Sequence, residues 1–357
     1  MLTTDENRGS APVIDLARES YRDIALYSPH GGRGGIDLSD NTNLWGAPPA
    51  ALRALATIGQ DEVTRYPVAF EPALSAALAE YVGVSPAMIA CGCGSDDLLD
   101  CAIRAFAEPG EVLCTPDPSF GMIPVFARTN GLSPVAVPLT SSLDVDAEAM
   151  LDTEARIIYL CSPNNPTGGA LPRGTVERIV ENARGLVIID QAYVEFGGEN
   201  YLDLASSGRP VLITRTMSKA FGLAGLRVGY GIASPELITE VLKARGPYKV
   251  SALAERAAIA ALGNDRAWVA DRANDVVTNR TRFRAELSTR GIASLDSSAN
   301  FVLVPVADCT ATAGRLERAG IRVRALPALS VIGDAIRVAI GPWDMMQKCV
   351  DALVDAA

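Results

Sequence analysis

The sequence predicts an α/β fold, in which a large domain with a mostly parallel, seven-stranded sheet is joined to a smaller α+β domain. Short apolar segments alternate with amphipathic, helix-like segments through the middle of the chain, a pattern typical of strand–helix–strand units. The apolar segments are almost continuous runs of Val, Ile, Leu and Cys, as in strands covered on both faces. From about Ala252 a long helical region and shorter strands follow, which indicates the second domain.

The predicted elements of the large domain follow one another at short intervals. The strands are Met88–Cys91, Glu111–Thr115, Ser133–Leu139, Arg156–Cys161, Leu186–Asp190, Val211–Thr214 and Arg227–Ala233. The helices are Asp96–Ala107, Gly121–Thr129, Thr175–Asn182 and Glu236–Lys243.

The C-terminal part is predicted to be helical from Ala252 to Arg290 and to end in a further helix. Between these helices we expect the strands Asn300–Val306, Arg322–Arg324 and Ala335–Ile340. We therefore divide the chain into an N-terminal arm (residues 1–20), a large domain (48–251) and a small domain (21–47 with 252–357).

Composition restricts the classes of partner. The chain of 357 residues has a formal net charge of -10, which argues against nucleic acid or an anionic membrane surface as a partner and favours small molecules. No apolar run approaches the roughly 20 residues that a membrane-spanning helix needs. The N-terminus also lacks a basic region followed by an apolar one. We expect a cytoplasmic protein.

Cysteine and histidine usage restricts the chemistry. Five of the seven cysteines lie in or beside apolar, strand-like segments and are expected to be buried free thiols, as in a reducing compartment: Cys91, Cys93, Cys114, Cys161 and Cys309. Only Cys101 lies near the Cys91–Cys93 pair, too few ligands for zinc, so we predict no metal site. The single histidine, His30, lies beside two glycines in a predicted loop. General base catalysis is therefore assigned to Lys, Asp, Glu or Tyr.

The segment Thr216–Arg227 surrounds one lysine with hydroxyls and small residues. A lysine attacks a carbonyl only when it is uncharged, and desolvation or a nearby cation lowers its pKa toward neutrality. Lys219 is placed for that role, whereas Ser218 and Arg227 have the donors to hold a phosphate. Alone, the segment also fits a Lys and an Arg on the exposed face of a helix.

Three further polar motifs lie at the ends of predicted strands, where open α/β sheets bind their ligands. Gly92–Asp97 joins a strand to a helix, so its backbone N–H groups could receive a phosphate, although a plain turn is the alternative. The turn Ser162–Gly168 offers amides that can donate to a ring oxygen. Asp190 ends a buried strand, where a protonated pyridine nitrogen would be a suitable partner and a helix cap is the alternative.

Together and in this order, these motifs resemble those of the fold-type I pyridoxal-phosphate aminotransferases, in the histidinol-phosphate aminotransferase branch. The resemblance extends from about Tyr27 to the C-terminus. The matching segments are Asn41–Gly46, Arg65–Pro67, Gly94–Asp96, Ser162–Gly168, Asp190–Tyr193, Thr216–Arg227 and Ile336–Gly341.

The resemblance implies how the cofactor, pyridoxal 5′-phosphate, is handled. Lys219 would form a Schiff base with it and, once displaced, move the proton between the substrate and the cofactor. Asp190 would keep the pyridine nitrogen protonated. Asn165 and Tyr193 would donate to the ring oxygen. Phe120 matches the aromatic residue that stacks on the ring, with an ordinary core Phe as the alternative.

The resemblance also assigns the phosphate site and the assembly. Ser95, Asp96, Ser218 and Arg227 would hold the cofactor phosphate, Asp96 mainly through its backbone N–H. Tyr66 matches a residue that reaches this phosphate from the other subunit, which implies a homodimer with shared active sites. A tyrosine before a proline in a surface turn is the alternative.

Substrate recognition is assigned by the same resemblance. Arg337 matches the arginine that clamps the α-carboxylate of glutamate, and Arg324 matches a second arginine that helps to hold the phosphate of histidinol phosphate. Arg322 and Arg324 alternate on one predicted strand, so one or both could instead face solvent. Asn43 and Tyr27 are the remaining predicted substrate contacts.

Departures from the family pattern leave the substrate open. Leu44 and Gln191 stand where the family usually has Pro and Glu, and the residues after Tyr27 also differ. We expect exchange of an amino group between histidinol phosphate and 2-oxoglutarate. The alternatives are an aminotransferase for an aromatic or specialised amino acid and, less favoured, a threonine-phosphate decarboxylase. A non-catalytic module would need an added sensor or DNA-binding domain, for which the chain has no room.

Overall fold

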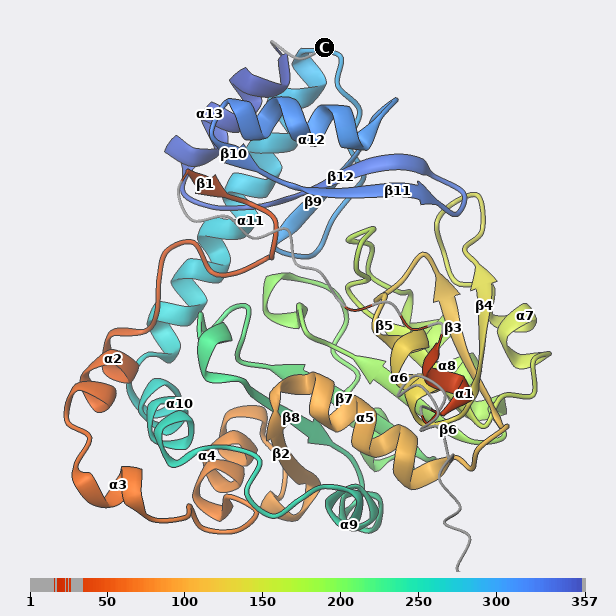
Figure 1. The fold of residues 1–357 in the computed structure, drawn as a ribbon, viewed down its shortest axis with the longest axis vertical. Helices are drawn as coiled ribbons and strands as arrows, with labels where there is room; N and C mark the ends of the chain where they lie inside the picture. The colour runs from red at the N-terminus through yellow and green to blue at the C-terminus, as the bar shows by residue number, and fades with distance from the viewer. Residues whose placement is uncertain (1–15, 17, 23, 25, 27–34, 355–357) are drawn as a thin grey trace, which may run out of the picture.

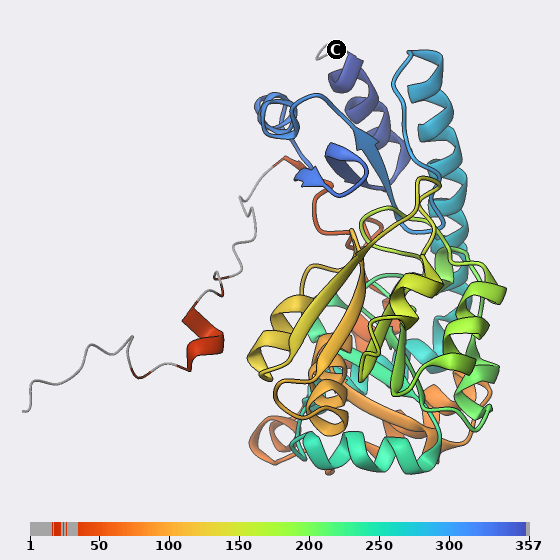
Figure 2. The same ribbon diagram turned by 90° about the vertical axis from the view of Figure 1, so that its right-hand side faces the viewer.

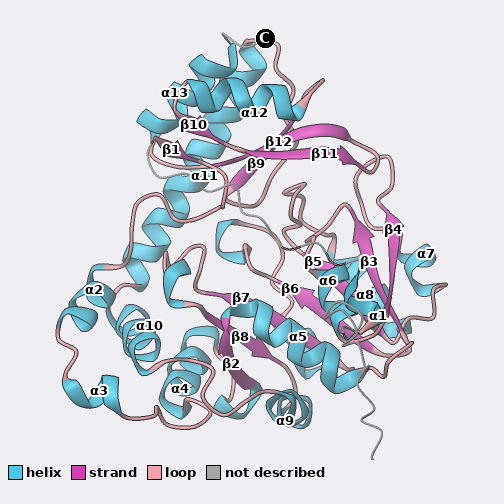
Figure 3. Cartoon of the chain, viewed as in Figure 1, coloured by secondary structure: helices cyan, strands magenta, loops and turns pink. Residues whose placement is uncertain are grey.

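The computed structural model describes residues 35–354, together with 16, 18–22, 24 and 26. The predicted contact Tyr27 and most of the N-terminal arm lie outside these residues. Two bodies are visible in Figure 1, a large domain below and a small domain above. Figure 3 shows helices on both sides of the large sheet, as the α/β prediction requires.

The large sheet has the strand order β2-β8-β7-β6-β5-β3-β4. Pairing is parallel from β7 through β6, β5 and β3 to β4, whereas β8 runs antiparallel to both of its neighbours. The predicted mostly parallel, seven-stranded sheet is confirmed. Its strands are β2 Ile89–Cys93, β3 Val112–Asp117, β4 Ser133–Pro138, β5 Ile157–Cys161, β6 Leu186–Asp190, β7 Val211–Thr216 and β8 Val228–Ile232.

Both faces of this sheet are buried along β5, β6, β7 and β8, as the near-continuous apolar strands predicted, whereas the edge strand β4 is largely exposed or half-buried. Along β5, Ile158 and Leu160 belong to one apolar cluster and Ile157 and Tyr159 to another, because successive side chains point to opposite faces. The large domain contains the helices α2 Pro49–Ala56, α3 Gln60–Thr64, α4 Pro72–Val82, α5 Gly94–Phe106, α6 Ile123–Thr129, α7 Ala147–Leu151, α8 Arg173–Asn182, α9 Pro235–Ala244 and α10 Ala252–Asn264. Helix α10 lies beyond the predicted boundary at residue 251, but it packs against α2 and α4. Short helical turns, η2 Pro86–Met88, η3 Val194–Phe196, η4 Leu202–Ser206 and η5 Ala224–Leu226, complete it.

The small domain has a three-stranded antiparallel sheet in the order β11-β12-β9 and a separate parallel pair, β1 with β10. Its strands are β1 Ile36–Asp37, β9 Phe301–Pro305, β10 Ile321–Arg322, β11 Arg324–Leu329 and β12 Gly333–Ala339. Its helices are α11 Arg266–Thr289, α12 Cys309–Arg318 and α13 Trp343–Val354. Figure 2 shows α11 running along one edge of the molecule, from the large domain to the small one. A short helix, α1 Glu19–Arg22, lies near α6.

The predicted helical region from Ala252 to Arg290 is confirmed as two helices, which meet at Asp265. The Asp265 carboxylate accepts a hydrogen bond from Ala50 N–H at 2.6 Å. The single strand predicted over Arg322–Arg324 was wrong. Arg322 and Arg324 do not share a strand. The chain changes partners at Val323, because β10 pairs with β1 and β11 pairs with β12.

Other elements were not assigned from the sequence. These are α1 to α4, α7, α12, β1, most of β11 and the short turns η2 to η5. The cysteine prediction was wrong for Cys93, which is exposed at the end of β2; the other six cysteines are buried, and all seven are free.

Candidate active site

Lys219 lies in the turn that follows β7, and every residue of that strand is buried. Its Nζ donates a hydrogen bond to the Asp40 carbonyl oxygen at 3.2 Å and lies 5.9 Å from the centre of the Tyr193 ring. Desolvation, and then the positive charge of Arg337, lower the pKa of Lys219 to about 8. A sizeable fraction of this amine is therefore uncharged near neutral pH, as a nucleophile or a base must be.

Asp190 is the last residue of β6, the strand that pairs with β7, and its side chain is buried. Its Oδ2 accepts a hydrogen bond from the Tyr159 hydroxyl at 2.8 Å, and its Oδ1 accepts one from Ala192 N–H at 3.1 Å. Burial raises the pKa of Asp190 to about 6 despite these donors. A cationic N–H placed against this carboxylate would supply the counter-charge that favours its ionised form.

Tyr193 follows Asp190 by three residues, and its hydroxyl accepts a hydrogen bond from Asn41 Nδ2 at 3.2 Å. Its ring packs edge-on against Phe301, with ring centres 5.2 Å apart. Burial raises the pKa of Tyr193 to about 12, so the hydroxyl stays protonated and can donate. Asn165 lies opposite, where its Oδ1 accepts a hydrogen bond from Arg337 at 2.6 Å. That bond turns the amide nitrogen of Asn165 away from Arg337.

Hydroxyl, guanidinium and helix-end groups form a cradle of donors beside Lys219. Arg227 contacts Ser218 Oγ at 3.4 Å and Asp96 Oδ2 at 3.1 Å. The first turn of α5, which includes Ser95, offers N–H groups that have no acceptor within the helix. Gly94 has a φ of +78°, a left-handed conformation that favours glycine, and the Arg227 guanidinium lies against it.

The two predicted substrate arginines lie side by side on neighbouring strands of the small sheet. Arg324 on β11 and Arg337 on β12 are register partners, so their side chains leave the same face of neighbouring strands. Arg337 also donates to the Ser39 carbonyl oxygen at 2.8 Å. Arg322, by contrast, forms an ion pair with Asp37 at 3.0 Å and is directed to the β1–β10 pair.

The remaining predicted site residues, Asn43, Phe120 and Tyr66, have other partners than Lys219 itself. Asn43 donates from Nδ2 to the Ala220 carbonyl oxygen at 2.9 Å, directly after Lys219. Phe120 is half-buried against the apolar cluster beside α5, next to Ser119, whose hydroxyl donates to Asn164 at 2.8 Å. Tyr66 is 83% exposed and stacks on Tyr248, with ring centres 4.9 Å apart.

Several groups that touch the site were not assigned from the sequence. They are the carbonyls of Ser39 and Asp40, the amide of Asn41 and the hydroxyl of Tyr159. Asn41 opens a motif that had been noted, and Tyr159 is the one polar side chain of the strand Ile157–Cys161. Backbone carbonyls carry no signal in the sequence, so the other two contacts could not have been predicted from it.

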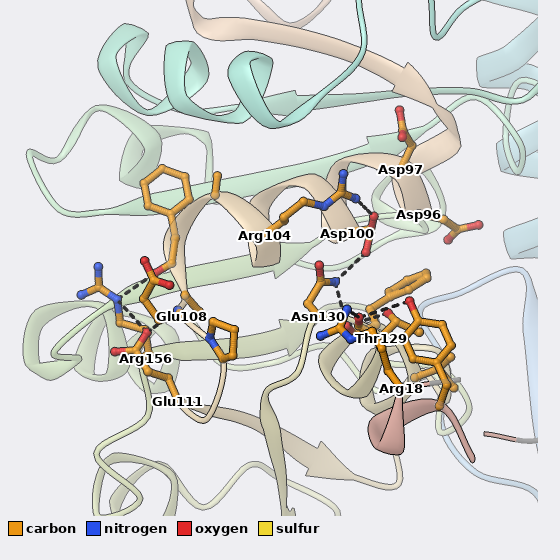
Figure 4. A pocket seen from close by; sticks show the side chains of 17 residues that line it. Arg18, Asp96, Asp97, Asp100, Arg104, Glu108, Glu111, Thr129, Asn130 and Arg156 are labelled. Carbon is orange, nitrogen blue, oxygen red and sulfur yellow. Dashed lines mark hydrogen bonds and ion pairs between the residues drawn. The ribbon is translucent and has the colours of Figure 1, made fainter. Parts of the chain in front are cut away.

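A surface cavity of about 930 Å³ lies elsewhere, along α5 and α6. Figure 4 shows two ion pairs among its charged side chains, Asp100 with Arg104 and Glu111 with Arg156, and Asp100 also accepts a hydrogen bond from Asn130 at 2.7 Å. Of the predicted site residues, Asp96 alone lines this cavity. Its size therefore does not identify it as the site of the chemistry.

None of the helices that the structure describes is both long enough and apolar enough to cross a membrane. The described residues contain no group of three or more His, Cys, Asp or Glu side chains that could hold a metal ion.

The donor set fits pyridoxal phosphate. The cradle of Ser218, Arg227 and the start of α5 has the donors for a phosphate, and it adjoins a lysine with a lowered pKa. Asp190, buried and protonated more easily than usual, would face a pyridine nitrogen. Tyr193 has a hydroxyl that can donate to a ring oxygen.

Known proteins are similar to this chain over most of its length. The family model for aminotransferase class I and II matches residues 33–353. Histidinol-phosphate aminotransferase of Roseiflexus castenholzii is 38% identical over 340 residues, which cover 90% of each chain. The same-named protein of Parabacteroides distasonis is 36% identical and covers 92% of this chain and 94% of its own.

Solved structures are similar as well. The histidinol-phosphate aminotransferase of Sinorhizobium meliloti, in complex with pyridoxal-5′-phosphate, has a TM-score of 0.86 at 27% identity and covers 94% of this chain and 96% of its own. Aspartate aminotransferase of Thermus thermophilus with maleate has a TM-score of 0.79 at 21% identity over 91% and 92% of the two chains, a likeness of fold alone.

Proposed function

The chain belongs to the class I and II aminotransferases, and from that premise we propose that it is a pyridoxal-phosphate-dependent histidinol-phosphate aminotransferase that uses 2-oxoglutarate as the acceptor. The observation that carries this proposal is the convergence of a lysine with a lowered pKa, a buried carboxylate and the guanidinium of Arg337 on one site. A histidine-biosynthetic role follows from the proposed substrate.

The proposed chemistry divides between the cofactor and the residues of the chain. When bound, pyridoxal phosphate supplies an aldehyde that takes up an amino group and a ring that accepts electrons. Lys219 provides an amine that can be uncharged near neutral pH, so its Nζ can accept a proton from the substrate Cα and deliver it to the aldehyde carbon of the cofactor, C4′. Asp190 presents its carboxylate to the ring nitrogen and holds a proton there.

Arg337 and Arg324 support the proposed substrate class. Arg337 is fixed by Asn165 and by the Ser39 carbonyl, which orients its planar guanidinium for a carboxylate. Arg324 lies across the strand pair, so a substrate held at the site meets a second positive charge. A phosphate dianion gains more from two guanidinium groups than an apolar aromatic side chain does.

The substrate proposal can be tested by half-reactions. The enzyme loaded with pyridoxal phosphate is mixed in turn with histidinol phosphate, histidinol, phenylalanine and glutamate, and loss of the cofactor's visible absorbance is followed. We expect fast reactions with histidinol phosphate and glutamate and a much slower one with histidinol, which lacks the phosphate. Fast reaction with phenylalanine but not with histidinol phosphate would instead support the aromatic aminotransferase.

We further propose that the enzyme is a homodimer with shared active sites. Tyr66 projects 83% exposed from the loop after α3, with the exposed apolar residues Val63, Val68 and Tyr248 around it. Such a group of exposed apolar side chains is typical of a surface that another protein covers. In the proposed dimer, Tyr66 of one subunit contacts the phosphate cradle of the other.

Mixed dimers test this assembly. Tyr66→Ala and Lys219→Ala subunits are each expected to be poorly active alone. After co-expression, the Tyr66→Ala subunit keeps its lysine and receives Tyr66 from its partner, so one working site returns in each mixed dimer. Absence of this complementation in dimers verified by light scattering would contradict the shared site.

We also propose a cytoplasmic location. Seven free cysteines, six of them buried, suit a compartment in which thiols stay reduced.

A further inference from the structure

Three consecutive residues, Ser39 to Asn41, touch three different site groups. The Ser39 carbonyl accepts a hydrogen bond from Arg337 at 2.8 Å, and the Asp40 carbonyl accepts one from Lys219 at 3.2 Å. Asn41 differs from these two because it acts with its side chain, donating from Nδ2 to the Tyr193 hydroxyl at 3.2 Å. A side-chain contact can be removed by substitution, so its contribution can be measured.

The position of Asn41 is fixed from both sides. Asn41 is 1% exposed, and its carbonyl oxygen accepts a hydrogen bond at 2.9 Å from Asn300 Nδ2, also 1% exposed. Its φ is +54°, a left-handed conformation that asparagine adopts more readily than most residues. The backbone therefore holds the Asn41 amide against Tyr193 and leaves it little freedom to turn away.

The Tyr193 ring is held independently of Asn41. It packs edge-on against Phe301, with ring centres 5.2 Å apart. The amide of Asn41 therefore does not set where the phenol oxygen lies. It occupies one acceptor direction of that oxygen, so the hydroxyl hydrogen must point elsewhere.

We propose that Asn41 is a positioning residue for the reaction, directing the Tyr193 hydroxyl hydrogen toward the cofactor's ring oxygen and strengthening it as a donor. This inference rests on the proposed function, because it requires pyridoxal phosphate in the site. An O–H whose oxygen accepts a hydrogen bond becomes a better donor, since each bond polarises the next. Loss of Asn41 Nδ2 should thus weaken the donation from Tyr193 without removing it.

The consequence can be measured in the bound cofactor's absorbance. When the nitrogen that joins Lys219 to the cofactor loses its proton, negative charge remains on the ring oxygen, and donation from Tyr193 stabilises that charge. A weaker donor therefore raises the pH at which the absorbance changes. The charged and titratable groups around Tyr193 are Arg337, Lys219, Asp190 and Cys161, and none of them is altered by substitution at Asn41.

The experiment is a pH titration of the visible absorbance of the full-length protein loaded with pyridoxal phosphate. Asn41→Gly removes the amide, permits the left-handed backbone and leaves the surrounding charges as they are. Asn41→Asp keeps the shape but replaces the amide donor with a carboxylate, which adds a negative charge beside Tyr193. Both should raise the midpoint, Asn41→Gly by about half a pH unit. Asn264→Gly, at the exposed end of α10, is the matched control and should leave the midpoint unchanged.

A double variant tests whether Asn41 acts through Tyr193. Tyr193→Phe should raise the midpoint further than Asn41→Gly, and adding Asn41→Gly to Tyr193→Phe should change nothing more. An unchanged midpoint in folded, cofactor-loaded Asn41→Gly and Asn41→Asp would overturn the inference. So would an equal shift in the Tyr193→Phe background, since Asn41 would then act by another route. If the unsubstituted protein failed to bind pyridoxal phosphate, the proposed function itself would be wrong.

Discussion

The cofactor side and the substrate side of the site are built differently. Asp190 and Lys219 follow β6 and β7, two fully buried strands in the middle of the large sheet. Arg324 and Arg337 lie on β11 and β12 of the small sheet, with half-buried side chains. On the cofactor side, burial itself shifts the pKa values of Asp190 and Lys219. On the substrate side, Arg337 is held by hydrogen bonds to Asn165 and Ser39.

The difference separates chemistry from specificity. A buried strand end gives a charged group little room and little water, so its proton affinity is set by the fold. A half-buried arginine remains charged in any case, and what the fold determines is its direction. Substitutions on the cofactor side should therefore affect all substrates alike, whereas substitution of Arg324 on the substrate side should discriminate among them.

The largest effect is expected at Lys219. Lys219→Ala should lower the half-reaction rate by at least about 10⁴-fold with every substrate, because both the nucleophile and the base are lost. Lys219→Arg is the matched control: it keeps the positive charge but cannot lose its proton, so it should be as inactive. Borohydride reduction should attach the cofactor to Lys219 in the unsubstituted enzyme. Substantial activity in Lys219→Arg would mean that the lysine acts only as a charge.

Asp190 should give the next largest loss. We expect Asp190→Asn to slow the half-reactions by about 10²-fold or more with histidinol phosphate and glutamate alike, since the amide cannot hold a proton on the ring nitrogen. Stopped-flow rates with both substrates measure this. A loss confined to one substrate would break the proposed division between the two sides.

The cofactor-free protein offers a second test of Asp190. Burial raises its pKa from 3.8 to about 6, so the folded state binds the proton more tightly than the unfolded state does. Stability should therefore fall as the pH rises from about 4 to about 6, by up to about 3 kcal/mol, and Asp190→Asn should lack this decrease. Urea unfolding of both proteins at the two ends of that range gives the difference, and parallel pH dependence in the two would contradict the raised pKa.

The same contrast explains what the sequence could predict. Asp190, Lys219 and the Gly94–Asp96 turn each follow an apolar strand, so the strand pattern alone brought them to one edge of the sheet. Arg324 and Arg337 lie on the two strands of one hairpin, and their pairing depends on strand register. Asn41 is separated from Tyr193 by 152 residues, and short-range patterns do not encode that contact. The family resemblance, rather than residue spacing, identified the arginines.

Arg337 connects the two sides, because it binds Asn165 as well as the expected carboxylate. Arg337→Lys should lower kcat/KM by about 10²-fold for both histidinol phosphate and glutamate, since an ammonium cannot make the paired hydrogen bonds of a guanidinium. Steady-state kinetics with each amino donor measure the loss. If the loss were seen with glutamate but not with histidinol phosphate, a group other than Arg337 would have to bind histidinol phosphate.

Arg324 should discriminate between substrates. Arg324→Ala is expected to lower kcat/KM for histidinol phosphate by about 10- to 100-fold while changing that for glutamate by less than about threefold, because it acts on the phosphate alone. Arg324→Lys keeps the charge and should recover part of the loss. Equal losses for the two substrates would remove the phosphate role from Arg324 and leave it a structural partner of Arg337.

Arg322 should have the smallest effect, although it lies only two residues from Arg324. It is bound to Asp37, whose pKa burial alone would raise but which hydrogen bonds from Ser39 and Arg322 hold below its ordinary value. Arg322→Ala should therefore change kcat/KM less than about twofold and cost about 1 kcal/mol of stability or less, as a partly exposed ion pair does. Since the lowered pKa stabilises the fold only while Asp37 is ionised, this cost should disappear as the pH falls below about 4. A selective loss of histidinol phosphate activity in Arg322→Ala would place the phosphate beside β10 instead of β11.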